Sequence, residues 1–403
     1  MDNLEKIKKI ESETLQTFKK EIPSMNFNHL DDQDYRNYVK DFERNYRECH
    51  KFPPKMFSNT NLIDFGAGTG HNTIYFANWG AKCTLVELSD KSLAIAKEVF
   101  NKFSANPNEH RFVNSSIFDF DEKDKLYDIV HCRGVLSHTA AKERAFKKIC
   151  KFVKNGGYLI YGDPNKAGGF QNMLQRYTLY KFSNSDEEIV KNSELLFKND
   201  IDRSKKKVAG RTRNEIIFDR WVIQNQDDPS FSEVCKWLAD CNLKLYSTYP
   251  TNPEFFLSDS IYSKKKVDIN KLINLPALCE ILWMMKTQDD VNFTASLEDD
   301  LEQLNQNFIN FTSYLANCNK KTKIDTKEFF ALSKKFLESV DNIKFMGNLK
   351  NKLVNFVSES KKLVDLVNNK NFIEVKKFVD KCSLLFKGPS GVRHVDFIAY
   401  KDD

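Results

Sequence analysis

Three glycines, Gly66, Gly68 and Gly70, stand at alternate positions directly after an apolar run that contains Asp64. A strand that enters such a turn brings bare backbone close to a ligand, and side chains larger than hydrogen would obstruct that approach. The residues after the turn are expected to form a helix whose free N–H groups face the same space. The pattern therefore predicts a site that holds its ligand partly on backbone N–H groups.

An acidic residue, Glu87, ends the next β-rich run, which begins at Ala81. A carboxylate about 20 positions beyond a glycine turn, at the end of the second strand, can accept hydrogen bonds from both hydroxyls of a ribose. A dinucleotide fingerprint would place its third glycine at position 71, which is His71 here. The spacing therefore favours a nucleoside-bearing cofactor and argues against NAD and FAD.

This arrangement resembles the first motif of the class I S-adenosylmethionine-dependent methyltransferases, a Rossmann-like family, with Asp64 and the three glycines on the matching positions. The resemblance continues through Glu87 and then through residues 111–118, 127–138 and 152–161, so it covers roughly residues 60–163. It implies an enzyme that uses S-adenosyl-L-methionine and releases S-adenosyl-L-homocysteine.

The resemblance also assigns parts of the cofactor to residues of this chain. It implies that the methionyl end is held by Asp64 and the Gly66–Gly70 backbone, the ribose by Glu87, and the adenine by Ser116 and Ile117. Arg133 then lines the channel toward the methyl group, through its backbone more than its charge. The family commonly has Gly-Asp at the end of the third strand, where the acid meets the adenine amino group, whereas this chain has Ser115 and Ser116.

Two residues near the expected methyl acceptor can take part in catalysis. His138 follows the fourth strand, where it could act as a general base, and a structural histidine is the alternative. Asp163 ends the fifth strand and could steer a cationic or amine acceptor, with turn formation as the alternative. A polar and aromatic group before residue 231 is a further candidate for the acceptor pocket: Asp219, Trp221, Gln224 and Asp228.

The nature of the acceptor is argued by elimination. The chain lacks the Pro-Pro motif of amino-methylating DNA enzymes after strand four, the nucleophilic cysteine of RNA cytosine enzymes, and the acid that magnesium-dependent catechol enzymes use. We therefore expect a small-molecule acceptor and no metal. One alternative is a methyltransferase of RNA or protein, in which a helical segment grips the polymer. A second is a non-catalytic scaffold that only binds the cofactor, against which the intact glycine turn and Glu87 speak.

The elements that must position these residues alternate between strand and helix, as a doubly wound sheet requires. We expect an α/β fold with a seven-stranded sheet of the class I methyltransferase type. Its strands are predicted at 61–65, 82–87, 110–113, 127–132, 157–162, 243–249 and 394–400. The last two are far apart, and the segment between them shows helical periodicity, as at Phe329, Leu332, Phe336 and Val340.

These patterns predict four parts. Residues 1–60 form an N-terminal helical cap, and 61–263 form the cofactor-binding core, with an irregular acceptor-side region at 164–230. Residues 264–390 form a large helical insertion between strands six and seven. Residues 391–403 return as strand seven. A homo-oligomer formed through the insertion is a further hypothesis.

Composition favours an intracellular enzyme. Nine cysteines include no Cys-x-x-Cys pair, so neither a zinc ribbon nor a disulfide framework is indicated. The net charge of +6 is modest for 403 residues, which favours a small-molecule partner over nucleic acid. The first residues alternate in charge and lack the apolar core of a signal peptide, and we expect a cytoplasmic protein with no membrane partner.

Overall fold

The computed structural model describes residues 3–123, 125–207, 211–223, 225–249, 280–281, 284, 301–316, 318–343, 347–387 and 394–402. Its centre is a seven-stranded sheet in the order β3-β2-β1-β4-β5-β7-β6. The strands are β1 (Asn61–Phe65), β2 (Lys82–Glu87), β3 (Arg111–Asn114), β4 (Tyr127–Arg133), β5 (Val153–Pro164), β6 (Leu243–Tyr249) and β7 (His394–Lys401). This confirms the predicted fold class.

The last strand lies between β5 and β6 and runs antiparallel to both, whereas β1 to β5 pair in parallel. In its register Asp396 stands opposite Gly162 on β5. A Cβ atom on Gly162 would lie 1.9 Å from Oδ1 of Asp396, so only glycine leaves room for this carboxylate. The register therefore brings an acidic side chain from the end of the chain to the carboxyl ends of the parallel strands.

Successive side chains of a strand point to opposite faces of the sheet, and helices cover both of these faces. Ile63 and Phe65 face the side covered by α5 (Lys142–Cys150) and α9 (Phe231–Asp240). Leu62 faces the side covered by α3 (Ile74–Asn78), α4 (Asp90–Phe103) and part of the N-terminal segment. Two short turns complete this part, η4 (Pro107–Glu109) and η5 (Leu136–His138).

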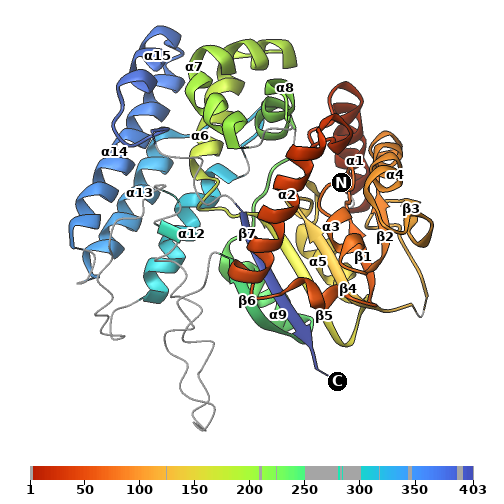
Figure 1. The fold of residues 1–403 in the computed structure, drawn as a ribbon. Coiled ribbons are helices and arrows are strands. Elements are labelled where there is room, and N and C mark those ends of the chain that lie inside the picture. The colour runs from red at the N-terminus through yellow and green to blue at the C-terminus, as the bar shows by residue number, and fades with distance from the viewer. Residues whose placement is uncertain are drawn as a thin grey trace, which may run out of the picture.

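The N-terminal segment covers the carboxyl ends of the parallel strands (Figure 1). It contains α1 (Asn3–Lys20), η1 (Phe27–His29), α2 (Asp32–Arg44), the π-helical turn η2 (Asn45–Cys49) and η3 (Pro54–Phe57). Side chains of α1 reach both neighbouring parts. Nζ of Lys8 donates to Asp119 at 2.5 Å, and Nζ of Lys20 donates to Asp186 at 2.6 Å. The segment therefore bridges the sheet and the helices beside it.

Those helices form a second compact part, which we call the helical body (residues 167–207, 211–223, 301–316, 318–343 and 347–387). Figure 1 shows it beside the sheet. It contains α6 (Phe170–Phe182), α7 (Asp186–Lys207), α8 (Arg213–Ile217), the π-helical turn η6 (Phe218–Val222), α12 (Leu301–Ala316), α13 (Thr326–Asp341), α14 (Gly347–Asn368) and α15 (Phe372–Lys381).

The helical body has a hydrophobic core of its own, separate from the clusters on the two faces of the sheet. Phe170 on α6 lies 5.0 Å from Phe311 on α12 and 6.0 Å from Phe356 on α14, between ring centroids. The expected face of α13 is buried, with Phe329 and Phe336 in this core.

The packing differs from the predicted division of the chain at one place. Residues 164–230 were assigned to the sheet unit as an irregular region, but 170–182, 186–207 and 213–217 are helical and pack with the helices after β6. The reason is that α6 is buried along almost its whole length, so it serves as the centre of a helical core rather than as a cover for the sheet. The four-part division itself stays a prediction. Among the helices that the structure describes, none has the length and apolar character to cross a bilayer.

Candidate cofactor and acceptor site

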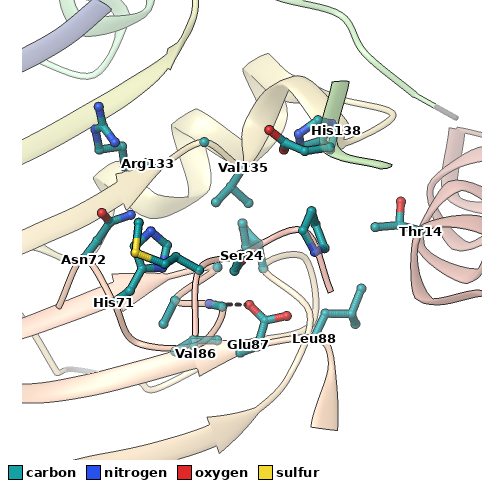
Figure 2. A pocket seen from close by; sticks show the side chains of 18 of the residues that line it. Thr14, Ser24, His71, Asn72, Val86, Glu87, Leu88, Arg133, Val135 and His138 are labelled. Carbon is teal, nitrogen blue, oxygen red and sulfur yellow. Dashed lines mark hydrogen bonds between the residues drawn. The ribbon is translucent and has the colours of Figure 1, made fainter. Parts of the chain in front are cut away.

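A cavity of about 530 Å³ lies at the carboxyl ends of the parallel strands, a usual size for a small-molecule site. Its walls come from the strand-end loops, from the N-terminal segment and from residues 211–226. Figure 2 shows Glu87 and Val86 on one side of it, Val135 and His138 opposite, and Arg133, His71 and Asn72 toward one end. Of the predicted site residues, those on the cavity wall are Gly66, Gly68, Glu87, Ser116, Ile117, Arg133 and His138.

The glycine turn is shaped as its sequence predicts. Gly66 and Gly68 have φ angles of +70° and +55°, a region that side chains other than hydrogen rarely adopt. A Cβ atom on Gly66 would lie 2.4 Å from a methyl group of Val135. One on Gly68 would lie 2.8 Å from the hydroxyl oxygen of Ser24. The turn therefore passes closely between two walls of the cavity, where no side chain fits.

Glu87 is buried at the end of β2, next to this turn. Its Oε2 accepts a hydrogen bond from the Gly68 N–H at 2.8 Å, and its Oε1 accepts one from the Ser89 N–H at 2.8 Å. Burial raises the pKa of this carboxyl, although these two N–H groups act in the opposite direction. A carboxylate has about four acceptor sites, so Glu87 can still receive hydroxyl donors from the cavity.

Two residues of the predicted cofactor motif lie behind the cavity wall. Asp64 accepts hydrogen bonds from Nδ1 of His131, at 2.7 Å, and from the hydroxyl of Thr73. It thereby joins β1 to β4 and to the start of α3. Gly70 has a φ of +75° and faces the Phe100 ring, 3.1 Å from where its Cβ would be. Both residues support the glycine turn from below, and neither lines the cavity.

Asp163 also lies behind the wall, because it is buried and is not among the residues that line the cavity. It accepts hydrogen bonds from the N–H groups of Leu136 and Ser137, the Ser137 hydroxyl and the Tyr161 hydroxyl, at 2.7 to 3.3 Å. Burial raises its pKa to about 7 despite these donors. The side chain turns inward because the N–H groups of the loop after β4 donate to it there. Asp163 thereby holds this loop in place.

His138 follows that loop and faces the cavity. Its Nδ1 lies 3.0 Å from the carbonyl oxygen of Asn225, which can only accept, so Nδ1 carries the proton. Burial lowers the pKa of the imidazole. A neutral ring with its proton on Nδ1 leaves the lone pair of Nε2 as an acceptor.

A cluster of charged side chains that the sequence did not reveal stands at the other end. Nε of Arg133 donates to Oδ1 of Asp396 at 2.8 Å, and Nε2 of His50 lies 3.1 Å from Oδ2. Burial alone would raise the pKa of Asp396, but Arg133 and His50 outweigh it and hold this pKa well below its usual value. All three residues line the cavity. Arg133 therefore lines the cavity with its guanidinium group paired to Asp396.

His71 occupies the position where a dinucleotide site would have glycine, and it lines the cavity. Burial, with the nearby charges of Arg211 and Arg133, lowers its pKa to about 3. A neutral imidazole is the form that two nearby positive charges favour. The sequence indicated only that His71 is not glycine, and its place in the wall comes from the packing of the N-terminal segment and residues 211–226.

The remaining wall comes from residues 211–226. Nη2 of Arg211 donates to the Pro23 carbonyl at 2.5 Å, and Nη1 donates to Asp219 at 3.3 Å. Asp219 and Gln226 line the cavity. Asp219 belongs to the polar and aromatic group that the sequence offered for the acceptor pocket, and Gln226 does not. Trp221 instead lies in the core of the helical body, and Asp228 is buried and accepts a hydrogen bond from Gln226. Gln224 lies outside the described residues.

Comparison with known proteins gives consistent results. The model of a methyltransferase domain matches residues 35–190. The ubiquinone biosynthesis O-methyltransferase of Nitrosomonas europaea is 29% identical over 109 residues, which are 27% of this chain and 46% of that protein. The sarcosine/dimethylglycine N-methyltransferase of Halorhodospira halochloris is 26% identical over 124 residues, 29% of this chain and 44% of that protein.

Among solved structures, PKMT2 from Rickettsia typhi is 16% identical with a TM-score of 0.44, covering 60% of this chain and 50% of its own. The chain spans a little under half the length of the two curated relatives. The strand order, the glycine turn and the position of Glu87 agree with this family match. Residues 35–190 lie in a class I S-adenosylmethionine-dependent methyltransferase domain.

Proposed function

We propose that this protein transfers a methyl group from S-adenosyl-L-methionine to a small-molecule acceptor that loses a proton in the reaction. The observation that carries the proposal is His138 at the cavity wall, with its Nδ1 bonded to the Asn225 carbonyl and its Nε2 left as an acceptor. A cytoplasmic location, predicted from the cysteine pattern, and a homo-oligomer formed through the helices after β6 belong to the same proposal.

The cavity suits the cofactor in its shape and its hydrogen-bond acceptors. Gly66 and Gly68 leave a passage that a side chain would close, and Glu87 stands beside it with acceptor capacity for two ribose hydroxyls. Ser116 and Ile117 also line the cavity, and Arg133 lies toward the end opposite Thr14 and Leu88 (Figure 2). The bound cofactor supplies a methyl group on a sulfonium, which a nucleophile takes by direct displacement.

The protein's own contribution is alignment and proton removal. His138 stays neutral because burial lowers its pKa, so Nε2 can take a proton from an acceptor hydroxyl or amine. The Asn225 carbonyl fixes the orientation of the ring, and the loop that carries His138 is held by Asp163. Oε1 of Gln226 is buried and accepts no hydrogen bond from the described residues, so it can receive a donor of the acceptor molecule.

The cover over the cavity favours a small molecule. Ile10 and Phe18 of α1 line one side, and Arg211 joins the segment after α1 to the helical body through the Pro23 carbonyl. A polymer would have to pass between these parts. RNA and protein remain the alternative substrates, for which the helical body would have to provide an outer contact surface.

The cofactor site is tested first by calorimetric titration with S-adenosylhomocysteine. We expect micromolar binding, reduced about tenfold to a hundredfold by Glu87→Ala through the loss of charge-assisted hydrogen bonds. Glu98→Ala is the matched control, because Glu98 lies on the exposed side of α4, accepts a hydrogen bond from Asn28 and does not line the cavity. Absence of binding by the parent protein would refute the proposed function.

The transfer itself is tested with a radiolabelled methyl group offered against separate pools of metabolites, RNA and protein. We expect label in the metabolite pool. His138→Gln should then lower kcat by about a hundredfold or more while leaving the affinity for S-adenosylhomocysteine unchanged. In the parent, kcat should fall as pH drops through the lowered pKa of His138, because protonation removes the base. Label confined to RNA or protein would overturn the small-molecule assignment.

A further inference from the structure

One end of the cavity forms an apolar slot with a carboxylate at its edge. Leu88, Ile117 and Phe118 line this slot from the sheet side. Ile10, Glu11 and Thr14 line it from α1. Figure 2 shows Thr14 and Leu88 at this end, far from Arg133. Apolar walls with a carboxylate among them suit the chemistry of a largely apolar ring that carries a hydrogen-bond donor on its edge.

The carboxylate of Glu11 is held against the strand-end loop. One of its oxygens accepts the hydroxyl of Ser116, and the other accepts Nζ of Lys8 at 3.1 Å. The side chain is only 16% exposed although it comes from the outermost helix of this region. Two of about four acceptor positions of the carboxylate are thus used, and the others remain for a donor in the slot.

The two serines at the end of β3 have already committed their hydroxyl hydrogens. Ser115 donates to the Ser116 carbonyl at 3.1 Å, and Ser116 donates to Glu11. The Ser116 oxygen also accepts the Phe118 N–H at 3.0 Å. Ser116 therefore serves to orient Glu11, and the stronger acceptor that the slot offers is the charged one.

We infer that Glu11 binds the exocyclic amino group of the adenine base and makes the site selective for it. This rests on the proposed cofactor site and names a residue outside the methyltransferase motifs as its base-reading group. A carboxylate accepts hydrogen bonds and repels a carbonyl oxygen, so it distinguishes a 6-amino purine from a 6-oxo purine.

The same contact makes the position of α1 depend on the base. Glu11 and Lys8 lie one turn apart on α1, and Lys8 also contacts Asp119 beyond the slot. A base that bonds to Glu11 gains affinity only when α1 is docked, and by linkage it favours the docked position to the same extent. Protection of α1 amides from hydrogen exchange should therefore increase when S-adenosylhomocysteine binds.

The test compares S-adenosylhomocysteine with S-inosylhomocysteine, in which a carbonyl oxygen replaces the amino group. The parent protein should bind the adenosyl compound at least about tenfold more tightly. Glu11→Gln should reduce this preference to about threefold or less, because an amide can turn either its oxygen or its NH₂ group to the base. Glu13→Gln on the same helix is the control, since Glu13 forms an ion pair with Lys9, at 4.0 Å, and does not line the cavity.

A second variant separates Glu11 from its neighbour. Ser116→Ala removes the hydroxyl but leaves the carboxylate, so most of the preference should persist. A preference lost in Ser116→Ala and kept in Glu11→Gln would overturn the inference, as would a parent protein that binds both compounds equally. If the parent binds neither compound, the proposed function fails instead, so the two failures can be told apart.

Discussion

The strand-end wall of the cavity and the wall formed by residues 211–226 differ in what positions them. The first consists of short loops, at 66–70, 87–88 and 133–138, each attached to a strand whose place in the sheet is set by parallel pairing. The second is carried by the helical body, whose core joins α6 to helices that follow β6. The cofactor side thus depends on the parallel pairing of neighbouring strands. The acceptor side depends instead on contacts between segments that are distant in the sequence.

The difference predicts that core damage in one region should leave the other region's ligand site intact. Phe311→Ala removes a buried ring that packs 5.3 Å from Phe329 and 5.5 Å from Phe336. We expect a loss of about 3–5 kcal/mol in the free energy of unfolding of the helical body. Affinity for S-adenosylhomocysteine should change by less than about threefold, because the two cores share no residues.

Phe76→Ala is the matched variant in the sheet domain, since Phe76 is buried and stacks on Phe57 at 4.6 Å. Phe76→Ala should lower the free energy of unfolding by about as much as Phe311→Ala. It should also weaken cofactor binding, because α3 follows the glycine turn. Region-specific hydrogen exchange measures both effects. Equal loss of protection in both regions after Phe311→Ala would show that they unfold as one unit and would end the comparison.

Asp396 tests a contact on which the cofactor side depends despite its distance along the chain. Asp396→Asn leaves Arg133 and His50 without their shared carboxylate, and we expect a loss of about 3 kcal/mol in the free energy of unfolding. Chemical denaturation of both proteins across a pH series measures it. A change below about 0.5 kcal/mol would mean that solvent in the cavity screens the pair.

The pH dependence of this difference has a definite sign. The pKa of Asp396 is held well below its ordinary value of 3.8, so the folded state binds this proton less readily than the unfolded state. Its contribution is therefore fully present above the unfolded pKa and is lost as pH falls through the folded pKa. The gap between parent and Asp396→Asn should be constant above about pH 5 and should narrow below about pH 4.

The predicted strands and the glycine turn depend on apolar runs and on backbone space, both of which are local in the sequence. The direction of an acidic side chain is not local. Asp64 and Asp163 end strands as Glu87 does, but the first two turn inward because His131 and the loop after β4 present donors to them. Nothing in the sequence around these residues distinguishes the three cases.

Residues brought to the cavity by distant segments were missed for the same reason. Glu11 lies on an amphipathic helix where acidic residues usually face solvent, and Asp396 is a polar position in a terminal strand. Their roles follow from the docking of α1 and from the register that sets Asp396 opposite Gly162. An alternating pattern predicts the strand but not its register.

The acceptor wall provides the smallest and most specific test, at Arg176 on α6. This fully buried side chain donates to the carbonyl oxygens of Arg220, at 2.9 Å, and Ile223, at 2.6 Å. It thereby holds the π-helical turn η6, which presents Asp219 to the cavity. Arg176→Lys keeps the charge but replaces the planar fork by one ammonium, so one of the two carbonyls loses its hydrogen bond to this side chain.

We expect Arg176→Lys to lower the free energy of unfolding by about 2 kcal/mol and to raise the KM for the acceptor more than it lowers kcat. Affinity for S-adenosylhomocysteine should stay unchanged. Arg213→Lys on α8 is the control, because its half-exposed ion pairs with Glu194 and Asp202 lie away from the cavity. Weaker cofactor binding in Arg176→Lys would show that the acceptor wall also sets the shape of the cofactor side, and the two walls would then have to be treated as one site.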